Sequence, residues 1–351
     1  VASMLPVSYQ DLSTFHPALE LHFFGSSFGE IIPNFTWPYA NDIISVTELP
    51  ECPDPCTCVL HHNIWTLDCK NDTRQEYTLL IYAAPNDFNI SALDGSRKQL
   101  VHITPGSFRN LSAVTILLLD YNLISKLDNG TFEGLSQLQV LDLSDNKLSQ
   151  INAGSFSGLG QLKQLFLNGN KLRKITGATF IGLCDVKVLT LSGNEISVLE
   201  SDTFTDLNRV QFLSIFNNSL VQLSPTLFQP LADDIGFLDL SENDLTDIDI
   251  DLFANLTNLT HLSLQGNALS QIGSVNGSTF MQLDSNNLTS LDLGVFRDLG
   301  KLTKLSLSDN KFLNLHEDLF QGLVNLSELW LNSNNLTTLE PGVFRDLSKL
   351  T

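Results

Sequence analysis

The sequence predicts an α/β-type repeat solenoid, in which short coils of chain stack behind a parallel sheet. Three observations lead to this prediction. A leucine pattern recurs with a period of 24 residues, an asparagine marks the same place in each period, and a phenylalanine usually follows ten residues later. A fixed period of this length is the signature of a repeat architecture. Because a solenoid presents a long face to other molecules, the search for function begins with a binding face.

The marker asparagines define the repeat. Segments 138–151 and 162–175 read LQVLDLSDNKLSQI and LKQLFLNGNKLRKI, and segment 302–315 reads LTKLSLSDNKFLNL. Successive markers are 24 residues apart, except for one step of 25 and one of 19. The markers are Asn122, Asn146, Asn170, Asn194, Asn218, Asn243, Asn267, Asn286, Asn310 and Asn334.

Leucine-type residues at fixed distances from each marker predict one short strand per coil. They stand at positions −8, −5, −3, +2 and +5, and positions −5 and −3 alternate with other residues as in a strand. Burial of each such side chain contributes roughly 1.5–3 kcal/mol, whereas ordering the backbone costs roughly 1–2 kcal/mol per residue. Several coils must therefore stack, and we expect a concave parallel sheet with an irregular convex side.

Each marker asparagine is expected to point inward where the chain leaves the strand. Its amide can donate to one carbonyl and accept from a backbone N–H of an adjacent coil. Leaving such groups unpaired would cost about 1–3 kcal/mol each. The phenylalanines at position +10 are predicted to form an aromatic spine on the convex side, which the coil of Asn267 lacks. They are Phe132, Phe156, Phe180, Phe204, Phe228, Phe253, Phe296, Phe320 and Phe344, with Phe108 in an earlier, degenerate coil.

The composition restricts the classes of function. A formal net charge of −20 argues against general nucleic-acid binding, which favours a basic stripe. Lys171, Arg173 and Lys174 form a local basic group, which we interpret as a solvated rim. No run of 18 apolar residues is present, so any membrane attachment is expected in a segment absent from this chain. The sequence stops at LSKLT, within a repeat, and we expect a fragment of a longer protein.

Four cysteines precede the repeats and predict a cap. Cys52, Cys56, Cys58 and Cys69 are spaced C-x3-C-x-C-x10-C. A zinc site is the alternative, but two disulfides that close the end of the core are preferred. Cys52–Cys58 with Cys56–Cys69 is the favoured pairing, although the sequence leaves three pairings open. Cys184 is expected near the surface as an unpaired thiol, with a link to another chain as the alternative.

Twelve N-x-S/T sequons indicate the secretory pathway when they are combined with the disulfide-type cap. We expect an extracellular protein that is secreted or displayed as a cell-surface ectodomain, with sugars that point away from the core. Asn217 borders the sheet, so a sugar there would restrict access to it. The sequons are at Asn34, Asn71, Asn89, Asn110, Asn129, Asn217, Asn255, Asn258, Asn276, Asn287, Asn325 and Asn335.

Three regions are predicted. Residues 1–50 form an aromatic-rich extension that packs on the cap, because disordered segments avoid aromatic residues. Residues 51–92 form the cysteine-rich cap, and residues 93–351 form the repeats, which stop before a C-terminal cap.

The candidate ligand-binding residues occupy positions −6, −4 and −2, which are predicted to face outward from the sheet. Exposed aromatic side chains there are unusual unless something covers them, and aromatic residues carry much of the energy of interfaces. The alternatives are that these rings only cover the sheet, or that the N-terminal extension lies over them. The candidates are Phe166, Phe212, Phe216, Phe237, Asp239, Phe280 and Trp330.

Catalysis is not expected. The sequence shows no nucleophile–base pattern and no phosphate loop, and we predict no cofactor and no bound metal. Asp244, Asp247, Asp249 and Asp251 contain the oxygen ligands that calcium prefers, but we interpret them as a solvated convex edge.

The pattern LxxLxLxxNxLxxLxxxxFxxLxx over residues 93–351, with the cap CPDPCTC…DC, resembles the extracellular leucine-rich repeat family. The many coils, sequons and short repeat are similar to a Toll-like receptor ectodomain. The GVFRDL segments at 294–299 and 342–347 resemble variable lymphocyte receptors. The resemblance implies a horseshoe that binds a microbial or protein ligand in innate immunity, and for a Toll-like receptor, dimerisation with the ligand. A secreted or matrix adhesion protein is the alternative.

Overall fold

The computed structural model describes the backbone of residues 57–61, 64–68 and 78–79, and residues 92–351 apart from 110, 250, 251, 254, 274, 276 and 277. The chain divides into two units, Val1–Leu49 and Pro50–Thr351. The first unit lies outside the described residues, as do the predicted packing of residues 1–50 and most of the predicted cap.

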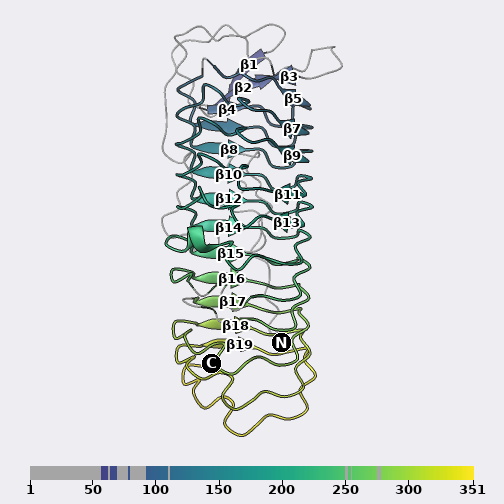
Figure 1. Cartoon of the computed structure of the whole chain (residues 1–351), viewed down its shortest axis with the longest axis vertical. Helices are drawn as coiled ribbons and strands as arrows, with labels where there is room; N and C mark the ends of the chain where they lie inside the picture. The colour runs from purple at the N-terminus through teal and green to yellow at the C-terminus, as the bar shows by residue number, and fades with distance from the viewer. Residues whose placement is uncertain are drawn as a thin grey trace. The chain divides into compact units, whose positions relative to one another are not determined.

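A sheet of thirteen strands runs through the second unit, and its strand order follows the chain (Figure 1). β1 (Thr57–His61) pairs with β2 (Ile64–Asp68) in antiparallel orientation, and all later neighbours in this sheet are parallel. The later strands are β4 (Ala92–Asp94), β6 (Ile116–Leu118), β8 (Val140–Asp142), β10 (Gln164–Phe166), β12 (Val188–Thr190), β14 (Phe212–Ser214), β15 (Phe237–Asp239), β16 (His261–Ser263), β17 (Phe280–Gln282), β18 (Lys304–Ser306) and β19 (Glu328–Trp330).

Stacked coils place equivalent residues side by side, so the predicted solenoid with a parallel sheet is confirmed. Leu141 lies opposite Leu117 on one neighbouring strand and Leu165 on the other. These leucines at position −5 are fully buried in the hydrophobic core. Because side chains alternate along a strand, positions −6 and −4 face away from this core. We call the surface formed by positions −6, −4 and −2 the outer face of the sheet.

The marker asparagines form a ladder that joins neighbouring coils, as predicted. The Oδ1 atom of Asn146 accepts a hydrogen bond from the Ile124 N–H at 3.0 Å. Its Nδ2 atom donates to the Leu119 carbonyl of the preceding coil at 2.9 Å and to the Leu143 carbonyl of its own coil at 3.1 Å. The same contacts recur from Asn122 to Asn334. Each amide therefore satisfies more carbonyls than the one expected from the sequence.

The residue before each marker adopts a left-handed backbone conformation, which the sequence analysis did not anticipate. The φ angle is 52° at Tyr121, 51° at Asp145 and 53° at Asn217. Glycine, which takes such angles without steric cost, occupies the same position at 169, 193 and 266. The turn after the strand is therefore the same in every coil, whichever residue stands there.

Phenylalanine rings stack along the back of the coils, which confirms the aromatic spine. Phe132 and Phe156 are nearly parallel, with ring centroids 6.0 Å apart. Further stacked pairs extend from Phe108 to Phe180, from Phe204 to Phe253 and from Phe296 to Phe344. In the short coil after Asn267, Val275 is only 1% exposed and lies in the core.

Turns and three pairs of two-residue strands form the side opposite the sheet. The pairs are β3 (Thr78–Leu79) with β5 (His102–Ile103), β7 (Lys126–Leu127) with β9 (Gln150–Ile151), and β11 (Lys174–Ile175) with β13 (Val198–Leu199). A short 3₁₀ helix, η2, covers Gln229–Leu231. Among the described residues, none belongs to a helix with the length and apolar character needed to cross a membrane.

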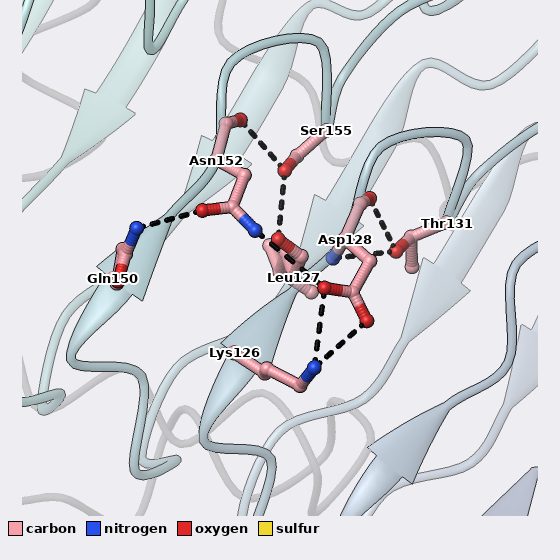
Figure 2. A network of polar contacts seen from close by, with 7 residues as sticks. All are labelled: Lys126, Leu127, Asp128, Thr131, Gln150, Asn152 and Ser155. Carbon is pink, nitrogen blue, oxygen red and sulfur yellow. Dashed lines mark hydrogen bonds and ion pairs between the residues drawn. The ribbon is translucent and has the colours of Figure 1, made fainter.

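Side-chain hydroxyls link the turns behind β7 and β9 (Figure 2). The Thr131 Oγ1 atom donates to the Asp128 carbonyl at 2.7 Å. Ser155 repeats this turn by donating to the Asn152 carbonyl at 2.8 Å, and it also contacts the Leu127 carbonyl of the preceding coil at 3.0 Å. Thr131 and Ser155 are both fully buried, and their hydroxyls are satisfied by backbone carbonyls of the turns, which also accept backbone N–H bonds.

Candidate ligand-binding face

Four ring side chains at position −6 form one continuous row on the outer face of the sheet. Phe212 and Phe237 stack with ring centroids 4.3 Å apart and planes inclined by only 4°. His261 lies 5.9 Å from Phe237 and meets Phe280 edge to face at 5.7 Å. The parallel register of β14 to β17 places these four residues directly opposite one another. We call Phe212, Phe237, His261 and Phe280 the aromatic row.

Exposure changes along this row. Phe212 is only 2% exposed, whereas Phe237, His261 and Phe280 are half-buried. The preceding part of the sheet is also less exposed, since all three residues of each of β6, β8, β12 and β14 are buried. The accessible part of the aromatic row therefore lies on β15 to β17.

The expected exposure is wrong for two candidates, Phe166 and Phe212. Phe166 is 1% exposed and lies in register between Asp142 and Thr190. Phe212 has one ring face against Phe237 and lies opposite Val188 of the preceding strand. Side chains on the same face of neighbouring strands are only about 5 Å apart, so neighbours at the same height in the stack can cover these rings.

The structure does not gather all of the candidates into one patch. Phe216 is half-buried at position −2 of the β14 coil, and Asp239 is half-buried at position −4 of β15. Trp330 is half-buried on β19, separated from β17 by β18. Phe212, Phe237 and Phe280 therefore form the core of the candidate site, while Phe166 and Trp330 lie on other parts of the sheet.

His261 belongs to the aromatic row but was missed by sequence reasoning, which considered only Phe and Trp as anchors. Burial lowers the pKa of His261 below its usual value, so the ring is neutral at pH 7. Its Nδ1 atom shares a hydrogen bond with the Thr260 hydroxyl at 2.9 Å. A neutral imidazole extends the row of flat rings. The residue opposite Phe280 on the next strand is Lys304, which forms an exposed ion pair of 3.0 Å with Glu328, so the row of rings ends at Phe280.

A second feature of the outer face is a group of three carboxylates, which we call the acidic cluster: Asp94, Asp120 and Asp142. Asp94 and Asp142 both lie at position −4 and flank Leu118 in the register of the sheet. Asp120 lies two residues beyond Leu118 on the same face. All three residues are buried, and the exposed fraction of Asp120 is 1%.

The carboxylates of the cluster differ in their hydrogen bonds. The Asp142 Oδ1 atom accepts from the Ser144 N–H at 2.9 Å and from the Ser144 hydroxyl at 2.6 Å. Asp94 is bound by Ser96 in the same way. In contrast, neither carboxylate oxygen of Asp120 has a hydrogen-bond partner. An unsatisfied buried carboxylate is expensive and calls for a specific explanation.

The electrostatic consequence is a strong preference of Asp120 for its neutral form. Burial, followed by the like charges of Asp142 and Asp94, raises the pKa of Asp120 to about 8. Burial also raises the pKa of Asp142 to about 6, against the opposing effect of the hydrogen bonds from Ser144. Arg97, whose guanidinium lies 4.6 Å from the centre of the Tyr121 ring, lowers the pKa of Asp120 only in part.

The described residues contain no group of three or more His, Cys, Asp or Glu side chains arranged to hold a metal ion. Of the acidic residues considered for calcium, Asp244 is exposed, and Asp251 lies outside the described residues. In the basic group, Arg173 pairs with Glu195 at 2.9 Å and Lys174 with Glu200 at 2.6 Å. These exposed pairs between neighbouring coils agree with the interpretation as a solvated rim.

The family model for leucine rich repeats matches residues 90–146, 112–172, 162–220, 279–336 and 301–351, which together are more than half of the chain. The chain belongs to the leucine-rich repeat family. The interval between the matches contains the 25-residue and 19-residue coils, yet β15 and β16 continue the leucine-rich repeat sheet through it. Among curated proteins, none matches the sequence.

Solved leucine-rich repeat structures share the fold. A leucine-rich repeat protein of Leptospira interrogans has a TM-score of 0.65 and 26% identity, over 76% of this chain and 67% of that one. A chain of the octameric complex of Latrophilin 3, Unc5D and FLRT2 has a TM-score of 0.66 and 21% identity, over 81% of this chain and 84% of that one.

A chain of the Toll–Spätzle complex of Drosophila has a TM-score of 0.62 and 20% identity. The match covers 77% of this chain but only 42% of the Drosophila chain. At 21% and 20% identity, the likeness to the chain of the Latrophilin 3 complex and to the Drosophila chain establishes the leucine-rich repeat fold alone.

The sequons fall into two groups on the leucine-rich repeat coils. Asn129, Asn217, Asn255, Asn258 and Asn335 are exposed, whereas Asn287 and Asn325 are half-buried. The Nδ2 atoms of Asn258 and Asn325 donate to backbone carbonyls at 2.6 Å. Sugars on the sequons remain a prediction. Asn34, Asn71, Asn89, Asn110 and Asn276 lie outside the described residues.

The cysteine predictions fall largely outside the described residues. Cys52, Cys56 and Cys69 are not described, and Cys58 is described only as part of the backbone of β1. The two expected disulfides therefore stay a prediction. Cys184 is exposed and free, as the sequence analysis favoured.

Proposed function

We propose that this leucine-rich repeat chain is an extracellular recognition module that binds a microbial or protein ligand through the accessible part of the aromatic row. The observation that carries the proposal is the continuous row of rings from Phe212 to Phe280, three of which are half-buried on β15 to β17. Side chains of this kind contribute strongly to interfaces, because each provides a large contact area at a low entropic cost.

The chemistry of the row suits an apolar or aromatic group on the ligand. Ring faces and edges prefer offset-stacked or edge-to-face contacts, which add about 0.5–1.5 kcal/mol beyond the burial of area. The described part of the chain offers no comparable arrangement for bond-making chemistry, and we propose binding rather than catalysis. Among the sequons, which we propose carry sugars, Asn217 follows β14 and borders the row there.

Participation in innate immunity is the finer part of this proposal. It is supported by the sequence resemblance to Toll-like receptors and by the structural likeness to a chain of the Toll–Spätzle complex. Dimerisation on ligand binding belongs to the same proposal.

A constitutive adhesion module is the second candidate. The likeness to a chain of the Latrophilin 3, Unc5D and FLRT2 complex favours it, since the match covers 84% of that chain, compared with 42% of the Drosophila chain. Both candidates use the outer face of the sheet to bind another molecule.

The experiment compares the native chain with Phe237→Ala and Phe280→Ala against immobilised lipopolysaccharide, lipoteichoic acid, peptidoglycan and flagellin. We expect at least one of these to bind the native chain, and each substitution to weaken that binding by about tenfold or more, as at interface hot spots. Leu313→Ala is the matched control, because this apolar side chain is 58% exposed but lies outside the sheet.

Two outcomes would contradict the proposal. Binding that is equally strong in the native chain and in both phenylalanine variants would exclude the aromatic row. Absence of binding to the whole panel would exclude the microbial ligands tested and leave the adhesion candidate, which dimerisation and cell-aggregation assays can examine.

A further inference from the structure

The last ring of the aromatic row is oriented differently from the others. Phe212 and Phe237 are parallel, and His261 is inclined to Phe237 by only 35°, so the face of the His261 ring is still directed along the row. Phe280 is nearly perpendicular to His261, with an interplanar angle of 86°. Phe280 therefore turns its edge toward His261, and no ring of the described residues stacks on either of its faces.

The lysine beside Phe280 does not bring a cation to this ring. Lys304 is the register neighbour of Phe280 on β18, but its ammonium pairs with Glu328 of β19 at 3.0 Å. Because β19 and β17 lie on opposite sides of β18, this pair draws the lysine head group away from Phe280. A cation does lie over a ring elsewhere in the chain, where the Arg97 guanidinium is 4.6 Å from the centre of the Tyr121 ring. Within the described ranges, Phe280 has no such contact.

The outer face around Phe280 is both accessible and acidic. Phe280, Gln282 and Asp284 occupy positions −6, −4 and −2 of one coil, and all three are half-buried, so part of each is open to solvent. Asp309, on the following coil, is exposed. Burial and, to a smaller extent, the like charge of Asp309 raise the pKa of Asp284 against a hydrogen bond from Ser306. A cation bound here would offset the repulsion between these two carboxylates.

The spacing of these positions fits an extended segment of a ligand that lies along β17. Alternate residues of a strand are about 6.6 Å apart, both on the coil and on an extended ligand. A ligand with arginine at every second position can therefore place one guanidinium over the Phe280 face and others beside Gln282 and Asp284. Guanidinium groups stack on aromatic faces and donate to amide and carboxylate oxygens, so one side-chain type suits all three positions.

We propose that the Phe280 face, together with Gln282 and Asp284, binds an extended, arginine-bearing segment of a protein ligand. The inference rests on the proposed function, because it uses the accessible end of the aromatic row as the binding face. Of the ligand classes in that proposal it selects a protein, and it requires a basic character that contacts between rings would not need. The net charge of −20 favours the approach of such a partner.

The test measures the affinity of the full chain for a fluorescein-labelled octapeptide of alternating glycine and arginine. Fluorescence anisotropy is the readout, at about 0.15 M ionic strength, where long-range attraction is screened. The matched peptide carries citrulline in place of each arginine, which keeps the shape of the side chain and removes its charge. We expect the arginine peptide to bind the native chain at least about tenfold more tightly than the citrulline peptide, as for loss of charge-assisted contacts.

Phe280→Leu removes the ring face but keeps an apolar side chain, so it should weaken binding of the arginine peptide by about three- to tenfold, the range of a cation–π contact. Phe280→Tyr keeps the ring and should retain the native affinity. Phe237→Leu is the matched control, because the Phe237 ring is stacked within the row, and it should leave the affinity nearly unchanged.

Glu328→Gln is a second variant that leaves Phe280 intact and releases Lys304 from its ion pair. The freed ammonium should compete for the ring face and weaken binding of the arginine peptide. Asp244→Asn removes an equal charge at an exposed position of another coil and should have no such effect.

Equal affinities for the arginine and citrulline peptides, or absence of measurable binding to the native chain, would overturn the proposal. Equal losses in the Phe280→Leu and Phe237→Leu variants would also overturn it, since no single ring face would then be responsible. Failure of this inference is distinguishable from failure of the proposed function. The first appears with the arginine peptide at Phe280, whereas the second appears with the microbial panel at Phe237.

Discussion

Single glycines decide how closely neighbouring coils approach on the side of the turns. Gly134 has a φ angle of 107°, and a Cβ atom built there would lie 2.4 Å from the Phe108 carbonyl oxygen. Gly158 stands at the same place one coil later with a φ angle of 89°, but no heavy atom lies within 4 Å of its Cβ position. The two residues share the left-handed backbone and differ in the space beside it.

This difference predicts unequal costs for the same substitution. Gly158→Ala should lower the free energy of unfolding by about 1 kcal/mol, the cost of a left-handed alanine. Gly134→Ala should cost a further 1–3 kcal/mol or so, because a backbone carbonyl must move. Urea unfolding of both variants measures the difference, and equal costs would show that the coils can separate without loss.

Asp120 makes stability depend on pH at the scale of one residue. Its folded-state pKa of about 8 is above the unfolded value near 3.9. A raised carboxyl pKa means that its contribution to stability is complete below pH 4 and is lost as the pH rises through 8.

The native chain should therefore lose about 1–4 kcal/mol of stability between pH 5 and 8.5 through this group. Asp120→Asn should remove most of that loss, while Asp244→Asn, at an exposed position, should retain it. Thermal unfolding across this pH range tests the expectation. A steep decline that persists in the Asp120 variant would assign the pH dependence to other groups.

At the scale of the element, the asparagine ladder separates residues that look alike in sequence. Asn286 is buried, accepts from the Leu269 N–H at 3.0 Å and donates to the Leu264 carbonyl at 2.9 Å. Its neighbour Asn287 is half-buried and makes a longer contact of 3.4 Å with the Ala268 carbonyl. Asn286 therefore joins its own coil to the preceding short coil through two buried hydrogen bonds, whereas the Asn287 side chain adds one longer contact to that coil.

Asn286→Ala should therefore lower the free energy of unfolding by about 2–5 kcal/mol, because several buried backbone groups lose their partners. Asn287→Ala should cost less than about 1 kcal/mol. Chemical denaturation of the two variants provides the measurement. If the costs were similar, the ladder would not be what fixes the short coil in the stack.

The elements were largely predictable from the sequence because each repeat position has one physical role. Leu141, Asn146 and Phe156 recur in register, so their places in the core, the ladder and the spine follow from spacing. The left-handed residue before each marker was missed because Tyr121, Asp145 and Glu242 share no side-chain chemistry. Repetition showed where each residue lies, but not the backbone angle that every coil imposes on it.

The candidate site was less predictable, since its members vary from coil to coil. Position −6 correctly brought Phe212, Phe237 and Phe280 together, but the burial of Phe166 and Phe212 could not be read from one coil. Asp120 was overlooked because its character depends on Leu118 and Asp142, which belong to different strands. Such properties arise only after the strands are aligned.

At the scale of the whole repeat unit, stability should be a sum over coils and their contacts with neighbours. Removing residues 146–169, one full period, joins Asp145 to Asn170 and preserves the register of every remaining coil. This deletion should fold cooperatively with the circular dichroism of a parallel sheet. Removing residues 146–157 should prevent cooperative folding, because the following leucines and asparagines lose their register. Comparable unfolding transitions in the two deletions would contradict a modular stack.

The division of labour between positions has an evolutionary meaning. The ladder, the leucines and the spine hold the coils together without using the side chains of positions −6 and −4. Those side chains are thus free to diverge. A new specificity can arise through a few substitutions on the outer face of the sheet, while the residues that support the fold stay the same. The acidic cluster on β4 to β8 and the aromatic row on β14 to β17 are two such sets of variable side chains on the same sheet.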